Sequence, residues 1–375
     1  MKKIFILTGE PSGDKLASEV VKELKKTKND VQYLSVGGQH LKYIGIKSIY
    51  DQKDITYIAF TDVLFNIFKI KRKINETVNK ILDFGPDILF SVDSPDFTLR
   101  VSKIIKLKNP NIKTIHFIAP KVWAWRGGRV KKMKSYLDHI LLLFNFEKKY
   151  FDKEKLKNTF VGHPILDYTN QEKIEINEVL KEKIISIFPG SRSSELKSHL
   201  PILVNFINKM NNKKLNYNYI FHTTESSKDY ISKIIKKNNF KNVDIISDEK
   251  IKNATIKKST FAIVKSGTVS LEVCKNGVPS IIIYKMNFFN FFIAKLLLKI
   301  KFVNMINIIN NKEIIPELLQ KECNSDEIYK TVNYFLKKPG IINEQLKQVK
   351  ITIKELTSNT SSSNEASNVL LSYLR

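Results

Sequence analysis

Short apolar segments that alternate with helical patterns restrict the fold of this chain more than any other feature. Such segments are typical of strands that are buried on both faces of a sheet, and parallel strands are usually connected by a helix. The expected strands are 3–8, 31–36, 87–92, 113–118, 138–143 and 158–161, followed by 183–188, 217–222, 243–246, 260–264 and 280–284. The alternation therefore predicts parallel α/β sheets.

A polar stretch at 168–178 interrupts this alternation, and the pattern of strands and helices then starts again. We therefore expect two α/β domains, over 1–168 and 179–340, with a cleft between them and ligands at the carboxyl ends of the strands. The remaining residues, 341–375, form a polar, helix-prone tail. Its place is left open by the sequence, and packing back on the first domain is one alternative.

The charge of the chain limits its partners. Sixty-three lysines and arginines stand against 37 acidic residues, a formal net charge of +26. This excess favours anionic partners, although a compositional bias that spreads lysines over solvated faces explains it equally well. Because the lysines occur in every segment without a basic tail or a known binding motif, we expect no nucleic-acid binding. The two cysteines lie far apart and fit a reduced, cytoplasmic compartment.

Two strand–turn–helix units in the second domain predict a nucleotide-sugar site. In "IISIFPGSRSSEL", Ser191 is a candidate helix cap and Arg192 a phosphate ligand beside free N–H groups at the helix start. In "FAIVKSGTVSLE", the turn Ser266-Gly267-Thr268 begins a helix, and Glu272 follows one turn later on the same face. A helix start suits a diphosphate and the carboxylate suits ribose hydroxyls. The alternative is that Ser-Gly-Thr only caps its helix.

The first domain begins with a similar unit that lacks a phosphate-binding fingerprint. "FILTGEPSGDKLASEVVKEL" leads from a strand through a glycine-rich turn into a helix, but it lacks G-x-G-x-x-G and carries Glu10 and Asp14 instead. Asp93 follows the strand "DILFSV" directly and has the chemistry of a general base. His163 is a rival base, although Gly-His-Pro more often forms a turn.

Seven motifs give the chain a specific resemblance. They are "GEPSGD" at 9–14, "SVDSPDF" at 91–97, "APKVWAWRGGRVKKM" at 119–133, "FNFEKKYF" at 144–151, "FVGHPILD" at 160–167, "PGSRSSE" at 189–195 and "SGTVSLE" at 266–272. With them the chain resembles the lipid-A-disaccharide synthases, bacterial glycosyltransferases of lipid A assembly. The first motif and the W-A-W-R block are specific to that family, whereas S-G-T…E is shared with many nucleotide-sugar enzymes.

The resemblance implies a GT-B fold of two Rossmann-like domains facing an interdomain cleft. It implies inverting transfer of 2,3-diacylglucosamine from UDP to 2,3-diacylglucosamine 1-phosphate (lipid X), which forms a β-1,6-linked lipid A disaccharide and UDP. The acceptor would occupy the N-terminal domain and the UDP-sugar the C-terminal one. No metal or other cofactor is expected, because cationic side chains and helix N-termini can offset the charge of the leaving UDP.

The resemblance also assigns residues. Asp93 would be the base, and Glu10 and Ser12 would contact the acceptor or the reacting centre. From the residues alone, capping of the helix that follows is the alternative for Ser12 and the expected role of Asp14. Asn307, Glu317 and Gln320 match polar positions of the substrate site. Lys312 stands where the family often has an arginine, and a lysine loses the bidentate geometry of a phosphate clamp.

Apolar residues at helical spacing beside lysines suggest a membrane-surface segment within 58–74. These are Phe60, Val63, Leu64, Ile67 and Phe68. No run of about 18 uninterrupted apolar residues occurs here or in 286–303, so we expect contact with the anionic inner face of the inner membrane and no crossing. Ordinary core helices are the alternative. A homodimer is left open.

Two other functions compete with the one that the resemblance implies. The first is another GT-B enzyme that uses a UDP-sugar, such as a UDP-N-acetylglucosamine epimerase or a transferase with a different acceptor. The second is a non-catalytic basic protein of the membrane surface. Release of UDP from a UDP-sugar separates the enzymes from the binding protein, and dependence on an acylated acceptor separates the two enzymes.

Overall fold

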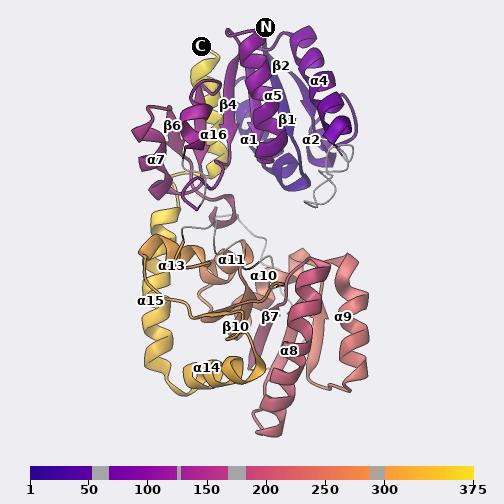
Figure 1. The fold of residues 1–375 in the computed structure, drawn as a ribbon, viewed down its shortest axis with the longest axis vertical. Helices are drawn as coiled ribbons and strands as arrows, with labels where there is room; N and C mark the ends of the chain where they lie inside the picture. The colour runs from indigo at the N-terminus through magenta and orange to yellow at the C-terminus, as the bar shows by residue number, and fades with distance from the viewer. Residues whose placement is uncertain (53–66, 125–127, 168–182, 288–290, 292–299) are drawn as a thin grey trace. The chain divides into compact units, whose positions relative to one another are not determined.

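The computed structural model describes residues 1–52, 67–124, 128–167, 183–287, 291 and 300–375 of the chain (Figure 1). They belong to two compact units, each with its own sheet and core. The first unit contains Met1–Asp167 together with Leu356–Arg375, and the second contains Tyr168–Glu355. The expected linker 168–178 lies outside the described residues.

The first unit is built on a six-stranded sheet of order β2-β1-β3-β4-β5-β6, in which every pair is parallel. The strands are β1 Lys2–Thr8, β2 Val31–Val36, β3 Ile88–Val92, β4 Lys113–Phe117, β5 His139–Leu142 and β6 Asn158–Phe160. Each overlaps a strand expected from the sequence. The parallel α/β prediction is therefore confirmed for this unit, and the pairing places the carboxyl end of β3 between those of β1 and β4.

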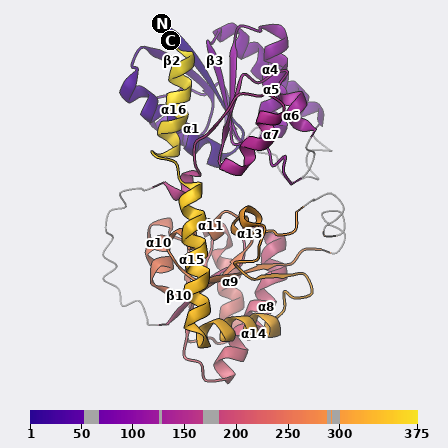
Figure 2. The same ribbon diagram turned by 90° about the vertical axis from the view of Figure 1, so that its left-hand side faces the viewer.

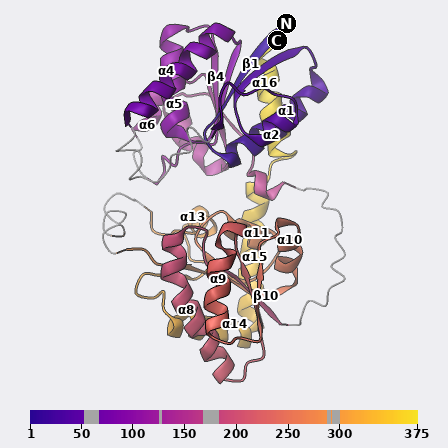
Figure 3. The same ribbon diagram turned by 90° about the vertical axis from the view of Figure 1, so that its right-hand side faces the viewer.

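Helices cover both faces of this sheet. They are α1 Pro11–Thr27, α2 Gln39–Tyr43, α4 Ile67–Phe84, α5 Pro95–Lys108, α6 Arg129–Met133, α7 Lys148–Lys153 and α16 Ser362–Tyr373. Each face of the sheet has its own hydrophobic core, and alternate side chains of β1 belong to one or the other. Ile4 and Ile6 pack with α1 and α16 on one face, whereas Phe5 and Leu7 pack with α4 and α5 on the other. Figure 3 shows these two helix pairs on opposite sides of the sheet.

The C-terminal segment is shared between the units. Helix α15, Pro339–Leu356, belongs to the second unit up to Glu355, while α16 packs beside α1 (Figure 2). Asp167 accepts hydrogen bonds from the Ser362 amide and from its hydroxyl, the latter at 2.7 Å. The tail predicted at 341–375 is therefore divided, and only its last part packs on the first unit.

The second unit carries another six-stranded parallel sheet, of order β12-β11-β10-β7-β8-β9. Its strands are β7 Ile184–Phe188, β8 Asn218–His222, β9 Val243–Ile246, β10 Ser259–Lys265, β11 Ser280–Tyr284 and β12 Glu317–Leu319. Its helices are α8 Ser193–Asn212, α9 Glu225–Lys237, α10 Glu249–Lys258, α11 Val269–Lys275, α13 Met305–Asn310, α14 Ser325–Lys337 and α15. The sequence predicted five of these strands and missed β12, which is three residues long and lies at the edge of the sheet.

Candidate active site

Asp14 does not cap its own helix. Glu10 occupies the N-cap position of α1, and the exposed Ser12 lies in its first turn. Asp14 is buried inside α1, and its carboxylate accepts hydrogen bonds from the amides of Gly38, at 2.6 Å, and His40, at 2.8 Å. These amides begin α2, so the prediction that Asp14 caps α1 is wrong: it caps the neighbouring helix instead.

The turn that follows β3 packs directly against the turn that follows β1. A Cβ built on Gly9 would lie 2.4 Å from the Cβ of Ser94, and one built on Gly13 would lie 3.1 Å from the carbonyl oxygen of Val92. The first approach leaves no room for a side chain at Gly9, and the second is tight enough that a side chain at Gly13 would require the backbone of Val92 to shift by a few tenths of an ångström. The motif therefore shapes the carboxyl edge of the sheet around Asp93.

Asp93 lies at the carboxyl end of β3 in a strained turn. Both Asp93 and Ser94 have left-handed backbones, with φ of 54° and 45°. The Asp93 amide donates to the Phe117 carbonyl at 3.0 Å, and the Ser94 amide donates to Asp93 Oδ1 at 2.8 Å. Burial raises the pKa of the Asp93 carboxyl above its usual range, although the Ser94 amide and the charge of Lys121 oppose the shift. A more basic carboxylate is a better proton acceptor.

A buried carboxyl beside this edge was not assigned by the sequence. Trp123 Nε1 donates to Glu147 Oε1 at 3.0 Å, and the Phe144 amide donates to Glu147 Oε2 at 3.3 Å. Burial raises the pKa of Glu147 to about 7, against the effect of these two donors and of the Lys121 charge. An acidic residue directly after the aromatic pair Phe144 and Phe146 was the signal that could have identified it.

His163 forms a turn, as the Gly-His-Pro pattern predicts. Its Nδ1 accepts the Ile165 amide at 3.2 Å at the start of a short 3-10 helix, Pro164–Leu166. Burial, assisted by the positive charge of Lys121, lowers the pKa of His163 to about 4. With Nδ1 used as an acceptor, the neutral ring carries its proton on Nε2, and it is a poor general base at neutral pH.

In the second unit, the helix start at "PGSRSSE" is capped from inside. The amides of Ser191 and Arg192 donate to Glu195 Oε2 at 3.1 and 3.4 Å. The amides of Ser191 and Arg192 are therefore not free for an anion, and Arg192, not a serine, occupies the N-cap position of α8. The Arg192 side chain is 80% exposed and remains accessible to a ligand.

The Ser266–Thr268 turn follows the neighbouring strand β10. Gly267 and Thr268 are exposed, whereas the Ser266 hydroxyl donates to the Val303 carbonyl at 3.0 Å and ties the turn to the loop before α13. Glu272 lies in α11, and its Oε2 is 2.8 Å from Lys252 Nζ. The carboxylate predicted for ribose hydroxyls is thus held in an ion pair with α10.

Asn307 and Glu317 are buried, and the chain itself occupies their polar groups. Glu317 accepts hydrogen bonds from the amides of Val303, at 2.8 Å, and Asn304, at 2.9 Å, and from Asn307 Nδ2 at 2.8 Å. Asn307 Oδ1 accepts the amides of Ile314 and Ile315. Glu317 thus holds the loop before α13, and Asn307 holds the segment that follows α13. The sequence alone does not distinguish such support from contact with a substrate.

Gln320 has a left-handed backbone with φ of 51°, at the end of β12. Its amide donates to the Tyr284 carbonyl at 2.9 Å, and its side-chain Nε2 is buried without a hydrogen-bond partner in the part of the chain that the structure describes. Lys312, which stands where the family often has an arginine, is exposed after α13.

Most of the predicted membrane segment lies outside the described residues. This applies to Phe60, Val63 and Leu64, while Ile67 begins α4. Phe68 is 85% exposed, beside the exposed Lys69 and Lys71. Among the residues that the structure describes, no helix combines the length and the apolarity that crossing a bilayer requires.

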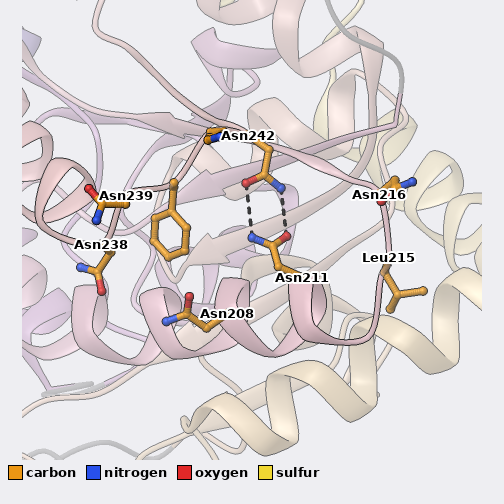
Figure 4. Close-up of a pocket in the computed structure, with 9 residues that line it drawn as sticks. Asn208, Asn211, Leu215, Asn216, Asn238, Asn239 and Asn242 are labelled. Carbon is orange, nitrogen blue, oxygen red and sulfur yellow. Dashed lines mark hydrogen bonds between the residues drawn. The ribbon is translucent and has the colours of Figure 1, made fainter.

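A pocket of about 420 Å³ in the second unit lies away from these residues (Figure 4). Asparagines dominate its lining, and Asn216 and Asn242 come just before β8 and β9, at the opposite end of the strands from Arg192. Asn211 and Asn242 exchange two amide hydrogen bonds, at 3.3 and 2.9 Å. These two asparagines therefore use their amide groups on each other.

Comparison with known proteins identifies the family. Residues 4–370 match the model of the family described as lipid-A-disaccharide synthetase. The chain belongs to this family. A lipid-A-disaccharide synthase of Rickettsia bellii is 36% identical over 366 residues, which cover 95% of this chain and 94% of the relative. Lipid-A-disaccharide synthetases form the lipid A disaccharide by glycosyl transfer, so the expected enzyme class is confirmed.

Solved structures with lower identity support the fold alone. UDP-GlcNAc 2-epimerase from Neisseria meningitidis bound to UDP-GlcNAc has a TM-score of 0.64 at 14% identity, and the alignment covers 100% of this chain and 99% of that one. MurG from Acinetobacter baumannii has a TM-score of 0.61 at 10% identity, with 99% and 100% covered. The GT-B fold expected for a lipid-A-disaccharide synthetase is confirmed. The epimerase likeness reflects that shared fold.

Proposed function

We propose that the chain transfers 2,3-diacylglucosamine from UDP to the 6-hydroxyl of 2,3-diacylglucosamine 1-phosphate. The products are the β-1,6-linked disaccharide 1-phosphate and UDP. The observation that carries the proposal is membership of the lipid-A-disaccharide synthetase family over residues 4–370, which include every motif named above. The roles of single residues are assigned from the chemistry of the side chains at the carboxyl ends of the strands in each sheet.

Asp93 is the base in this proposal. The acceptor oxygen attacks the anomeric carbon, its proton moves to the Asp93 carboxylate, and the bond between that carbon and the UDP oxygen breaks. The electron pair of the broken bond stays with UDP, and the configuration at the anomeric carbon inverts. The raised pKa of Asp93 and its place at the carboxyl end of a central strand support this role. Glu10 and Ser12, on the adjoining turn, contact acceptor hydroxyls.

Arg192 and the Ser266–Thr268 turn bind the donor. Arg192 is exposed, and its guanidinium can donate two parallel hydrogen bonds to a diphosphate as negative charge develops on the leaving UDP. The exposed Gly267 and Thr268 lie at the end of the neighbouring strand. Glu272, held by Lys252, faces the ribose in this assignment.

We assign two different roles to the polar residues that match the family pattern, Asn307, Glu317 and Gln320. We assign Asn307 and Glu317 to the support of the loop that receives the Ser266 hydroxyl bond, because both side chains are buried and hydrogen-bonded within the chain. Gln320 is the substrate contact among them. Its buried and unpartnered Nε2 provides a donor for a ligand oxygen.

The assay uses purified protein with UDP-2,3-diacylglucosamine and lipid X. We expect formation of the disaccharide 1-phosphate with one UDP released per disaccharide, and no turnover when glucosamine 1-phosphate replaces lipid X. Equal turnover with the non-acylated acceptor would indicate another transferase. Conversion of UDP-N-acetylglucosamine to its 2-epimer would indicate an epimerase.

We also propose that the enzyme acts at the cytoplasmic surface of the inner membrane. The exposed Phe68 beside Lys69 and Lys71 supports this, because an aromatic ring can enter lipid while lysines contact anionic headgroups. A variant with Val63, Leu64, Ile67 and Phe68 replaced by serine should lose binding to vesicles that contain anionic lipid. Serine at Tyr43 and Leu107, exposed apolar side chains elsewhere in the unit, is the matched control.

Unchanged vesicle binding by a folded form of the first variant would contradict the membrane proposal, and loss of folding would favour a core role for the segment. The homodimer stays a prediction, which sedimentation analysis of the purified protein can check.

A further inference from the structure

Lys265 is the last residue of β10 and directly precedes the Ser266–Thr268 turn. Its Nζ lies 3.0 Å from Glu195 Oε1, although the two residues are 70 positions apart in the chain. The adjoining strands β10 and β7 pair Val264 with Phe188, which brings their carboxyl ends together. Lys265 therefore connects the two turns to which the donor site has been assigned.

Glu195 is held in place around this contact. One of its oxygens accepts the Ser191 and Arg192 amides, and the other faces Lys265. A Cβ built on Gly190, where φ is 111°, would lie 2.4 Å from Glu195 Oε2, so only glycine leaves room for this carboxylate. Burial raises the pKa of Glu195, but Lys265 and the two amides outweigh it and hold the pKa below its usual range. The carboxylate is ionised at neutral pH.

Two cations share this one carboxylate. Arg192 Nη1 lies 3.9 Å from the same Oε1 that faces Lys265. The three side chains together carry a net charge of +1. An ammonium group has three N–H donors, and the bond to Glu195 occupies one of them.

The ammonium group also lies close to the exposed turn. Lys265 Nζ is 3.8 Å from the position that a Cβ would take on Gly267, and the Lys265 side chain is 20% exposed. An anion that contacts Gly267 and Arg192 is thus within reach of a second, partly buried positive charge.

We propose that Lys265 is a further donor-binding residue, which contacts the diphosphate of the UDP-sugar while Glu195 holds its ammonium group in place. The inference rests on the proposed function, since the donor is the ligand. A partly buried cation contributes more to diphosphate binding than a solvated one, because water screens it less. Glu195 keeps that cation paired before the donor arrives.

The test measures the dissociation constants of UDP and uridine by calorimetry. For Lys265→Met we expect UDP affinity to fall about 10- to 100-fold, the range for a charge-assisted hydrogen bond, with uridine affinity unchanged. The dependence of UDP affinity on salt should weaken. Lys265→Arg retains the charge and should retain most of the affinity, and Lys258→Met, at an exposed lysine of the same unit, should bind UDP as the wild type does.

A double variant separates a direct contact from an effect of an unpaired Glu195. Lys265→Met with Glu195→Gln removes both charges and keeps an oxygen for the two amides. If Lys265 contacts the diphosphate, the double variant stays weak. Recovery of wild-type UDP affinity in the double variant would overturn the proposal, as would unchanged UDP affinity in a folded Lys265→Met protein or an equal loss of uridine binding. Failure of the wild-type protein to bind UDP would instead overturn the proposed donor.

Discussion

Gly9 and Ser94 approach so closely that a methyl group on Gly9 would lie 2.4 Å from the Cβ of Ser94. Gly9 follows β1 and Ser94 follows β3, two adjacent strands of the first sheet. Ser94 is also the neighbour of Asp93, and its amide holds the Asp93 carboxylate. The distance between these two residues therefore sets the position of the proposed base.

Gly9→Ala should destabilise the fold and lower turnover, because the added methyl group displaces the Asp93–Ser94 turn. We expect a loss of about 1–3 kcal/mol in the free energy of unfolding, measured by urea titration. Adding Ser94→Gly should restore both quantities, since it removes the clashing Cβ at a left-handed position that glycine adopts readily. Gly128→Ala is the control, because among the described residues, chain neighbours aside, no atom lies within 4 Å of the added carbon. A wild-type stability and turnover in Gly9→Ala would contradict the close approach.

Asp93→Asn should lower acceptor-dependent turnover by about 10²–10⁴, the usual contribution of a general base. Asparagine tolerates the left-handed backbone of this position, so the turn should survive. UDP affinity should stay near that of the wild type, because the residues proposed to bind the donor lie in the other unit. Turnover within a few-fold of the wild type would transfer the role of base to Glu10.

Arg192→Ala should weaken UDP binding by about 1.5–3 kcal/mol for each charged hydrogen bond lost. The Arg192 amide still donates to Glu195, so the start of α8 should keep its structure. Calorimetry with UDP measures the effect, and a thermal unfolding scan provides the control for folding. A folded variant that binds UDP as the wild type does would exclude the guanidinium from the donor site.

Glu147 should make the free energy of unfolding depend on pH. Its pKa is about 7 in the folded chain, above the 4.5 of an exposed glutamate, so the folded state retains the proton that the unfolded state loses. Stability from this group is complete below about pH 4.5 and is lost as the pH rises through about 7, a change of about 3 kcal/mol.

Urea unfolding of the wild type and of Glu147→Gln at pH 5 and pH 8 isolates this contribution. The difference in stability between the two proteins should shift by roughly 2–3 kcal/mol in favour of the variant at the higher pH. The same difference at both pH values would mean that Glu147 is ionised in the folded state. Trp123→Phe removes the indole N–H that donates to Glu147 Oε1 at 3.0 Å. It should raise the pKa of Glu147 further, because that bond stabilises the ionised carboxylate.

The buried strands and the nucleotide-type turns could be predicted from local sequence. Eleven of the strands that the structure describes overlap segments expected from the sequence, most of them apolar, and the glycines and polar residues that follow several of them mark the turns. The resemblance added the family, and with it the proposal that Asp93 is the base. The edge strand β12 was missed: it is three residues long, and it pairs in parallel with β11.

Hydrogen bonds and ion pairs between residues far apart in the chain could be found only in the tertiary structure. The sequence assigned Asp14 as the cap of its own helix, but the Asp14 carboxylate accepts hydrogen bonds from the amides of Gly38 and His40, which lie 24 and 26 positions further along the chain. Lys265 lies beside Glu195 because β7 and β10 pair. The physical reason is that a strand or a turn is selected by the few residues around it, whereas a hydrogen bond or an ion pair depends on which elements the packing of the whole unit brings together.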